Sequence, residues 1–143
     1  MKTLYIAYGS NLNLDQMAMR CPTAKVLGSS TLRGYQLLFR GYESGAVATI
    51  EKRANGKVPV LVWELETSDE KALDRYEGWP SFYRKEYIKI NLNCKWVIAM
   101  VYIMNEGRRL GKPSQRYYNT IYKGYRDAGF NTNILNEAVI KSI

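Results

Sequence analysis

The sequence predicts an α+β domain with a mixed, curved sheet that closes towards a small barrel and carries flanking helices. Two observations support this prediction. Apolar, β-rich segments fill most of the chain between residues 31 and 104, whereas helical patterns occur near both ends and once in the middle. The chain also contains no repeat, low-complexity tract or linker, and its 143 residues suit one domain. We therefore expect a single domain over residues 1–143.

The first two elements are predicted from an abrupt change of pattern. Residues 3–8 are apolar throughout, as in a strand covered on both faces. The small polar residues 9–11 follow at once, and residues 13–20 then have a helical pattern with Asn13 as the expected N-cap. Such a turn points several backbone N–H groups at one spot. It is either a tight connection or a binding site for a carboxylate, a phosphate or an oxyanion.

The middle of the chain is predicted to supply most of the sheet. Asn55-Gly56 is a strong signal for a turn between two strands. Pro59 stands near the start of the strand that follows, where its missing N–H is tolerated. A second tight turn is expected near Asn93. The predicted strands are residues 31–40, 46–51, 58–65, 84–92 and 96–104.

A helix is predicted over residues 68–77. Thr67 and Glu70 have the spacing of a capping box, and two acidic residues in the first turn suit the helix dipole. Gly78 is the expected end of the helix, and Pro80 follows it.

Glu77 is the last residue of this helix and lies at the edge of its predicted buried face. At about 100° per residue, a carboxylate at this position is half turned towards the core, beside the indole of Trp79. Partial desolvation there raises its pKa and suits it to proton transfer. The alternative is an ordinary glutamate at a helix boundary. The buried face is predicted to contain Ala72, Leu73 and Tyr76, with Asp74 and Arg75 pointing away.

Two helices are predicted at the end of the chain. Ser114 is the expected N-cap of the first, which carries an aromatic stripe and ends at Gly129. Tyr117 lies at the mouth of this helix, where its hydroxyl either reaches a cleft or belongs to the core. Residues 132–141 form the second helix.

The composition limits the chemistry. The net charge is +8, but the basic residues form no block, so a solvated surface is favoured over a nucleic-acid site. Histidine is absent, and Cys21 and Cys94 lie far apart, which excludes a Cys–His pair, a zinc site and a CxxC redox motif. Catalysis would have to rest on a carboxylate, a hydroxyl, a lysine or backbone dipoles. Without an apolar run of ~18 residues or a signal peptide, a cytoplasmic protein with free thiols is expected.

Five segments, in order, resemble the γ-glutamylcyclotransferase-like (AIG2-like) family. The similarity spans about residues 4–129, and its one departure is Leu61 or Val62 in place of a family glycine. The segments are residues 5–12 (opening strand and YGSN substrate loop), 45–50 (G-x-A-T), 60–65 (V-x-G-x-[VL][WY]), 73–78 (L-D-x-x-E-G) and 113–124 (P-S-x-x-Y-x-x-x-I-x-x-G).

This resemblance implies the family's fold and its reaction. The reaction is the intramolecular cyclisation of a γ-glutamyl amide to 5-oxoproline, with release of an amino acid or amine. It requires no metal, cofactor or covalent intermediate. By the resemblance, Glu77 is the catalytic general acid/base. The residues implied to bind the small-molecule substrate are Tyr8, Gly9, Ser10, Asn11, Leu12 and Tyr117.

Two alternatives remain open at the level of the sequence. One is a γ-glutamylamine cyclotransferase, whose leaving group is a lysine side chain or a polyamine. Arg40 and Arg84 are candidates to border that part of the pocket, and a cluster of positive charge there would argue against a cationic leaving group. The other is a non-catalytic binder of small anions or nucleic acid, against which Glu77 argues. The sequence carries no signal for an oligomeric state.

Overall fold

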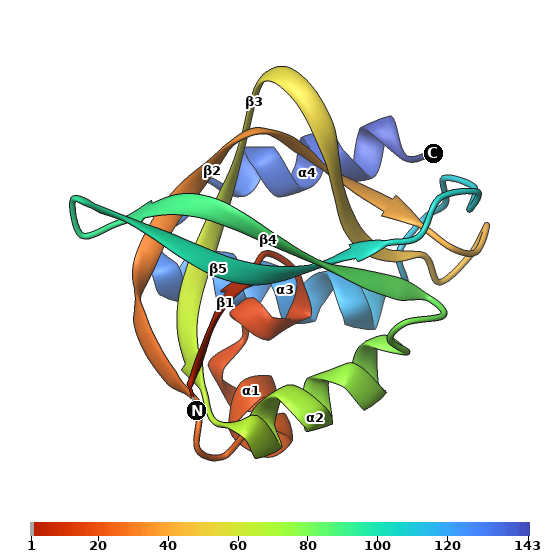
Figure 1. Cartoon of the computed structure of the whole chain (residues 1–143). Helices are drawn as coiled ribbons and strands as arrows, with labels where there is room; N and C mark the ends of the chain where they lie inside the picture. The colour runs from red at the N-terminus through yellow and green to blue at the C-terminus, as the bar shows by residue number, and fades with distance from the viewer. Residues whose placement is uncertain (1) are drawn as a thin grey trace.

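The computed structural model describes residues 2–143 and contains a five-stranded sheet in the order β2-β3-β1-β5-β4 (Figure 1). β1 pairs antiparallel with β3 and parallel with β5, so the sheet is mixed, as predicted. The strands are β1 (Thr3–Ala7), β2 (Lys25–Arg40), β3 (Val47–Leu65), β4 (Tyr83–Leu92) and β5 (Lys95–Met104).

The sheet curls until its two edge strands approach each other. In Figure 1, β2 and β3 bend across the whole molecule. The hydroxyl of Ser30 in β2 donates a hydrogen bond to the carbonyl of Asn91 in β4, although these strands are not neighbours in the sheet. Gly28 permits this approach, because a Cβ there would lie 3.3 Å from a methyl carbon of Leu92. The predicted curved sheet that closes towards a small barrel is confirmed. The sheet itself stays open, and a side-chain hydrogen bond joins its two edges.

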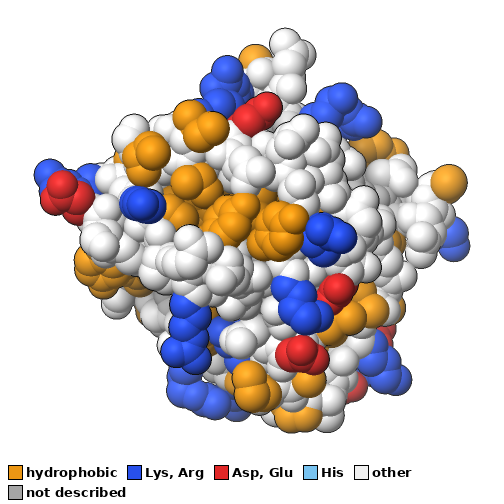
Figure 2. Space-filling model, turned by 180° about the vertical axis from the view of Figure 1, so that it is seen from behind, with side chains coloured by type: hydrophobic (Ala, Val, Ile, Leu, Met, Phe, Trp, Pro, Cys, Tyr) orange, Lys and Arg blue, Asp and Glu red, His pale blue; other side chains and the backbone are white. Residues whose placement is uncertain are grey.

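The helices lie outside this curved sheet. Figure 1 shows α3 and α4 behind it and α1 and α2 together below it. Seen from behind, hydrophobic side chains form a band over α3 and α4 (Figure 2). On α3, the rings of the half-buried Tyr118 and Tyr122 stack. None of the helices in the described part of the chain could cross a membrane. The helices are the 3-10 turn η1 (Ser10–Leu12), α1 (Leu14–Arg20), α2 (Thr67–Glu77), α3 (Gln115–Ala128) and α4 (Thr132–Lys141).

Asn55-Gly56 does not join two strands, and this prediction is wrong. β3 runs past both residues without a break, and its pairing with β2 shifts register between Arg33 and Tyr35. Asn55 has a φ of 63°, and a Cβ on Gly56 would lie 2.2 Å from the carbonyl oxygen of Tyr35. The turn-forming residues therefore make a bulge that bends one long strand. β2 also begins earlier than predicted, because residues 25–30 pair with the end of β3.

The predicted capping box of α2 is displaced by one residue. Glu66 is the N-cap, and the carboxylate of Asp69 accepts a hydrogen bond from its N–H at 2.9 Å. Asp69 is buried and also accepts a bond from the hydroxyl of Thr23 at 2.7 Å. Glu70 is drawn instead towards Lys85, 2.7 Å away. Tertiary partners therefore decide which of two adjacent acids caps the helix.

Tyr125 provides a test of the core. Its hydroxyl is buried on α3 and has no hydrogen-bond partner among the described residues. We expect Tyr125→Phe to raise the free energy of unfolding by about 1 kcal/mol, because an unpaired buried hydroxyl is removed. Urea denaturation of the two proteins measures this difference. A destabilised variant would show that the hydroxyl has a partner after all.

Candidate functional site

The turn after β1 presents backbone N–H groups beside the core. The hydrogen bonds of η1 begin with the N–H of Leu12, which donates to the carbonyl of Gly9 at 3.0 Å. The N–H groups of Ser10 and Asn11 precede these bonds, and the turn supplies no acceptor for them. Leu12 differs from its neighbours, because its N–H is already used and its side chain is buried.

Glycines allow this turn to be tightly enclosed. A Cβ on Gly124 of α3 would lie 2.7 Å from the Cβ of Leu12 and 2.8 Å from its carbonyl carbon. A Cβ on Gly9 would lie 3.1 Å from the Cβ of Ala48 in β3. The last glycine of the fifth sequence motif therefore has a packing reason: it lets α3 press against the turn.

Glu77 and the turn border the same small cavity. The cavity has a volume of about 20 Å³, enough for one water-sized group. It is lined by residues 8–11, Ala48 and Glu77, and by the tyrosines at positions 5, 83, 102 and 117. The structure thus brings together all the residues assigned to the site from the sequence except Leu12.

A larger cleft opens beside this cavity. It has a volume of about 360 Å³ and shares Glu77, Tyr83 and Tyr117 with the cavity. Its other walls are largely aromatic and include Tyr42 and Phe82, whose rings stack with centroids 6.3 Å apart. Glu77 therefore stands between a space for a single atom and a space large enough for the rest of a small substrate.

The carboxyl of Glu77 is set up to exchange a proton. Burial raises its pKa from an ordinary 4.5 to about 7, and the positive charge of Arg20 offsets this only in part. No described residue donates a hydrogen bond to it. The predicted direction of the pKa shift and its cause, desolvation, are therefore right, but the group expected to exclude water is wrong. Trp79 is 43% exposed and faces the ammonium of Lys85 at 4.2 Å, so tyrosines and not an indole enclose the carboxyl.

The tyrosine hydroxyls around Glu77 are held by main-chain groups. Tyr8 donates to the carbonyl of Tyr102, and Tyr83 donates to the carbonyl of Ala48, both at 2.6 Å. The N–H of Ala48 in turn donates to the oxygen of Tyr117 at 3.0 Å. Burial raises the pKa of Tyr8, Tyr83 and Tyr117 above the ordinary range. These side chains are neutral phenols at physiological pH.

The orientation of α2 differs from the predicted one. Leu73 is buried as expected, but Tyr76 is 44% exposed. Asp74 faces the sheet, where it accepts a hydrogen bond from Tyr102 at 2.6 Å and pairs with Lys85 at 2.9 Å. The helical period of the apolar residues does not reveal that β4 and β5 offer polar partners to this helix. These contacts hold the end of α2, and with it Glu77, against the sheet.

Arg20 is a site residue that sequence reasoning missed. It comes from the end of α1, and its guanidinium stacks 3.6 Å above the ring of Tyr76. The hydroxyl of Tyr76 lies 3.1 Å from that of Ser10, so α1, α2 and the turn meet here. No motif marks Arg20. Only its position in the last turn of a helix next to the YGSN segment could have drawn attention to it.

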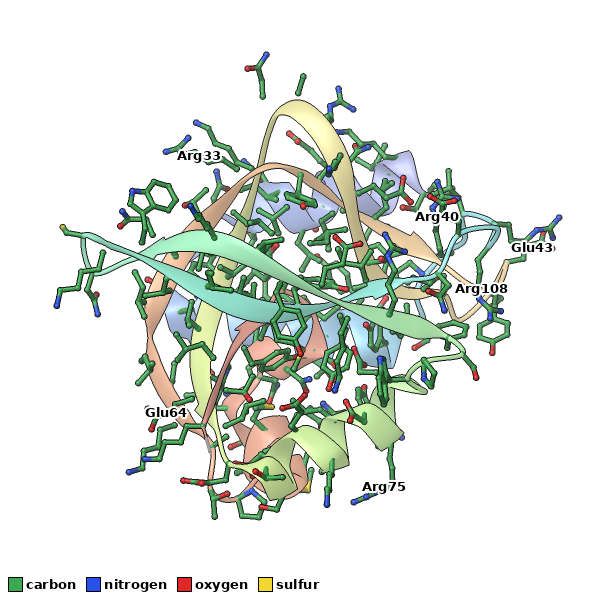
Figure 3. The ribbon with its side chains drawn as sticks, in the orientation of Figure 1. Arg33, Arg40, Glu43, Glu64, Arg75 and Arg108 are labelled. Atoms are coloured by element: carbon green, nitrogen blue, oxygen red, sulfur yellow. The ribbon has the colours of Figure 1, made fainter. Side chains whose placement is uncertain are left out.

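Arg40 and Arg84 do not border the Glu77 cleft. They line a separate cavity of about 670 Å³ that shares no lining residue with it. Each is paired with an acid, Arg40 with Glu51 and Arg84 with Glu86. In Figure 3, Arg40 and Arg108 lie together at one end of the sheet, and Arg40 donates to the carbonyl of Arg108 at 2.8 Å. Within residues 2–143, no group of three or more His, Cys, Asp or Glu side chains could hold a metal ion.

A comparison with known proteins shows the family of this chain. Residues 5–124 match the family described as "Gamma-glutamyl cyclotransferase, AIG2-like". The chain belongs to this family. It is therefore an enzyme of the γ-glutamyl cyclotransferase type, as the five motifs indicated.

Named relatives and a solved structure align with most of this chain. It is 29% identical to the γ-glutamylcyclotransferase of Mus musculus and 28% identical to that of Homo sapiens, in both cases over 88% of this chain and 71% of the relative. A solved structure titled "Gamma-glutamyl cyclotransferase" superposes with a TM-score of 0.85 at 24% identity, over 96% of this chain and 86% of the other. The predicted fold is confirmed.

Proposed function

We propose that this cyclotransferase converts a γ-glutamyl amide into 5-oxoproline and a free amine, with Glu77 as the general acid/base. One observation carries the proposal. A carboxyl with a pKa of about 7 borders a one-atom cavity formed by the turn after β1. A general acid/base works best when its pKa lies near the operating pH. Glu77 can therefore both accept and return a proton in one turnover.

The reaction can be written with these groups alone. The ionised Glu77 takes a proton from the substrate's α-ammonium, and the freed amine attacks the γ-carbonyl carbon. A C–N bond forms and closes a five-membered ring, while the carbonyl oxygen gains negative charge. The carbonyl re-forms as the original amide C–N bond breaks, and Glu77 returns its proton to the leaving nitrogen. The ring nitrogen gives its surplus proton to the released amine, which leaves as an ammonium. Because both reacting groups belong to one molecule, a pocket that holds the substrate folded supplies much of the rate.

The turn and the tyrosines suit two groups of such a substrate: the γ-carbonyl oxygen, which gains negative charge, and the α-carboxylate. The N–H groups of Ser10 and Asn11 are the donors we assign to the γ-carbonyl oxygen. Tyr117 accepts a bond from the N–H of Ala48 and keeps its own proton for the substrate's α-carboxylate. Tyr8, whose proton is already donated, would shape the wall of the cavity. Leu12 would hold the turn in place.

The charges near the cleft favour an amino acid as the leaving group. Arg75 lines the cleft, and Arg20 and Arg116 line a cavity of about 210 Å³ that shares Tyr76 and Tyr117 with the cleft. Glu77 is the one acidic residue among the described residues that line either space. Positive charge repels an ammonium and attracts a carboxylate. We therefore place γ-glutamyl amino acids ahead of γ-glutamyl polyamines as substrates.

A panel of γ-glutamyl amides tests the function. The purified enzyme is incubated with γ-glutamyl-alanine, γ-glutamyl-ε-lysine and γ-glutamyl-putrescine, and 5-oxoproline is measured. We expect product from γ-glutamyl-alanine, with a kcat/KM at least about tenfold above that for the putrescine conjugate. The absence of 5-oxoproline from every amide would refute the proposed function. A preference for putrescine would refute the assignment of the leaving group only.

The pKa of Glu77 predicts the pH dependence. Because Glu77 acts in its ionised form, kcat/KM should be half-maximal near pH 7 and fall about tenfold per pH unit at lower pH. Initial rates with γ-glutamyl-alanine between pH 4 and pH 8 measure this profile. An acid limb with a midpoint near pH 4.5 would mean that burial does not perturb the working carboxyl.

A further inference from the structure

Tyr5 lies in the cavity but has no role in the mechanism described so far. It belongs to β1, is buried, and packs edge-to-face on Tyr102 with ring centroids 5.9 Å apart. It lines the one-atom cavity together with Glu77 but does not line the outer cleft. Next to burial, the charge of Glu77 does most to raise the pKa of Tyr5, as expected for two groups that line the same small cavity.

A chain of hydrogen bonds fixes the direction of the Tyr5 hydroxyl. An arginine can only donate, and Arg20 donates to the side-chain oxygen of Asn11. The NH₂ group of the Asn11 amide must then point the other way, towards Tyr5. It donates a hydrogen bond to the Tyr5 oxygen, with 2.9 Å between the two atoms. Gln16 holds Arg20 in place by accepting a bond at 2.8 Å. The oxygen of Tyr5 is therefore an acceptor in this chain, and its own proton is left over.

The leftover proton distinguishes Tyr5 from its neighbours in the cavity. Tyr8 and Tyr83 donate their protons to main-chain carbonyls. Tyr117 keeps its proton, but it lines the outer cleft as well as the cavity. Tyr5 has no acceptor for its proton among the described residues, and burial raises its pKa well above the ordinary range, so the proton stays on the oxygen. A cavity with room for one oxygen atom lies next to it.

We propose that Tyr5 is a further catalytic residue: directed by Arg20 and Asn11, its hydroxyl donates a hydrogen bond to the γ-carbonyl oxygen as that oxygen gains negative charge. This inference rests on the proposed cyclisation. A donor that is oriented before the reaction and shielded from water stabilises developing charge most effectively. The N–H groups of Ser10 and Asn11 would meet the same oxygen from the side of the turn.

Tyr5→Phe tests the donor while keeping the ring that packs on Tyr102. We expect kcat for γ-glutamyl-alanine to fall on the order of 10²-fold. KM should change less than about threefold, since the hydrogen bond strengthens only in the transition state. The matched control is Tyr125→Phe, which removes another buried phenol hydroxyl outside the site and should leave both constants unchanged. An unchanged kcat in Tyr5→Phe would overturn the inference.

Asn11→Asp tests the direction of the hydrogen bonds that run from Arg20 through Asn11 to Tyr5. A carboxylate at this position accepts from both sides, so the Tyr5 proton turns away from the cavity. We expect a loss of kcat similar to that of Tyr5→Phe, and less than about threefold further loss when the change is made in the Tyr5→Phe protein. Equal losses in the two backgrounds would overturn the role of Asn11.

The assays distinguish failure of the proposed function from failure of the inference about Tyr5. If the proposed function is wrong, the wild-type protein forms no 5-oxoproline from any γ-glutamyl amide, and both proposals fall. If the wild type is active and Tyr5→Phe is equally active, only the inference about Tyr5 falls.

Discussion

Glu77→Gln is expected to lower kcat for 5-oxoproline formation on the order of 10³-fold, the typical contribution of a general acid/base. The amide fills the same space but can neither accept the proton of the α-ammonium nor return it to the leaving nitrogen. The assay is 5-oxoproline release from γ-glutamyl-alanine at pH 8. The matched control is Glu137→Gln, an exposed glutamate on α4, which should retain full activity. Wild-type turnover in Glu77→Gln would show that the acid/base role is wrong.

The same variant should be more stable than the wild type above pH 7. Burial raises the pKa of Glu77 from 4.5 to about 7, so the folded protein disfavours the ionised form. Below pH 4.5 the carboxyl is protonated in both the folded and the unfolded state, so its ionisation does not lower the free energy of unfolding. As pH rises from 4.5 to 7, only the unfolded state ionises freely, and the wild type loses stability. Glutamine avoids this loss, which is on the order of 3 kcal/mol in free energy of unfolding.

Urea denaturation at pH 8 and pH 5 measures this effect. We expect Glu77→Gln to exceed the wild type in free energy of unfolding at pH 8, and the difference to shrink at pH 5. Lost activity together with gained stability is the mark of a group held in an unfavourable environment for function. If the variant is less stable than the wild type at pH 8, the carboxylate has stabilising partners in the fold.

Gly124→Ala is expected to destabilise the protein and to impair the site together. The added Cβ would lie within 2.9 Å of three atoms of Leu12, two of which belong to the main chain and cannot rotate away. Overpacking of this kind costs about 1–3 kcal/mol. To make room, α3 or η1 must move, and η1 carries the donors that we assign to the substrate. We therefore expect kcat/KM to fall on the order of tenfold or more.

The measurements are the urea midpoint and kcat/KM for γ-glutamyl-alanine. In an uncrowded helix, Gly→Ala raises stability by about 1 kcal/mol, so the sign of the change is itself decisive. A stabilised Gly124→Ala protein with normal kcat/KM would mean that α3 does not press on the turn.

The fold class and the framework of the site could be predicted from the sequence. The turn at residues 9–11, the helix that ends with Glu77 and Gly78, and the glycine-terminated helix after Ser114 all depend on neighbours a few residues away. Local patterns report local structure, so these elements were predicted close to their observed bounds. The five ordered segments then connected them to one family and one reaction.

Long-range contacts limited the prediction. Asn55-Gly56 has the local chemistry of a hairpin turn, yet the pairing of β3 with β2 turns it into a bulge. Asp74 looks like a surface acid in the helical period, yet Tyr102 and Lys85 draw it to the sheet. In each case a partner distant in sequence overrides the local preference.

A carboxylate at a helix end and a small-residue turn after the first strand can both be derived from the sequence alone. Their surroundings depend on contacts between distant segments of the chain. The order β3-β1-β5-β4 brings tyrosines from separate strands around Glu77, and α3 adds Tyr117. The raised pKa of Glu77 and the free proton of Tyr5 both depend on that enclosure, because desolvation and hydrogen-bond direction come from groups that meet only when the sheet curls.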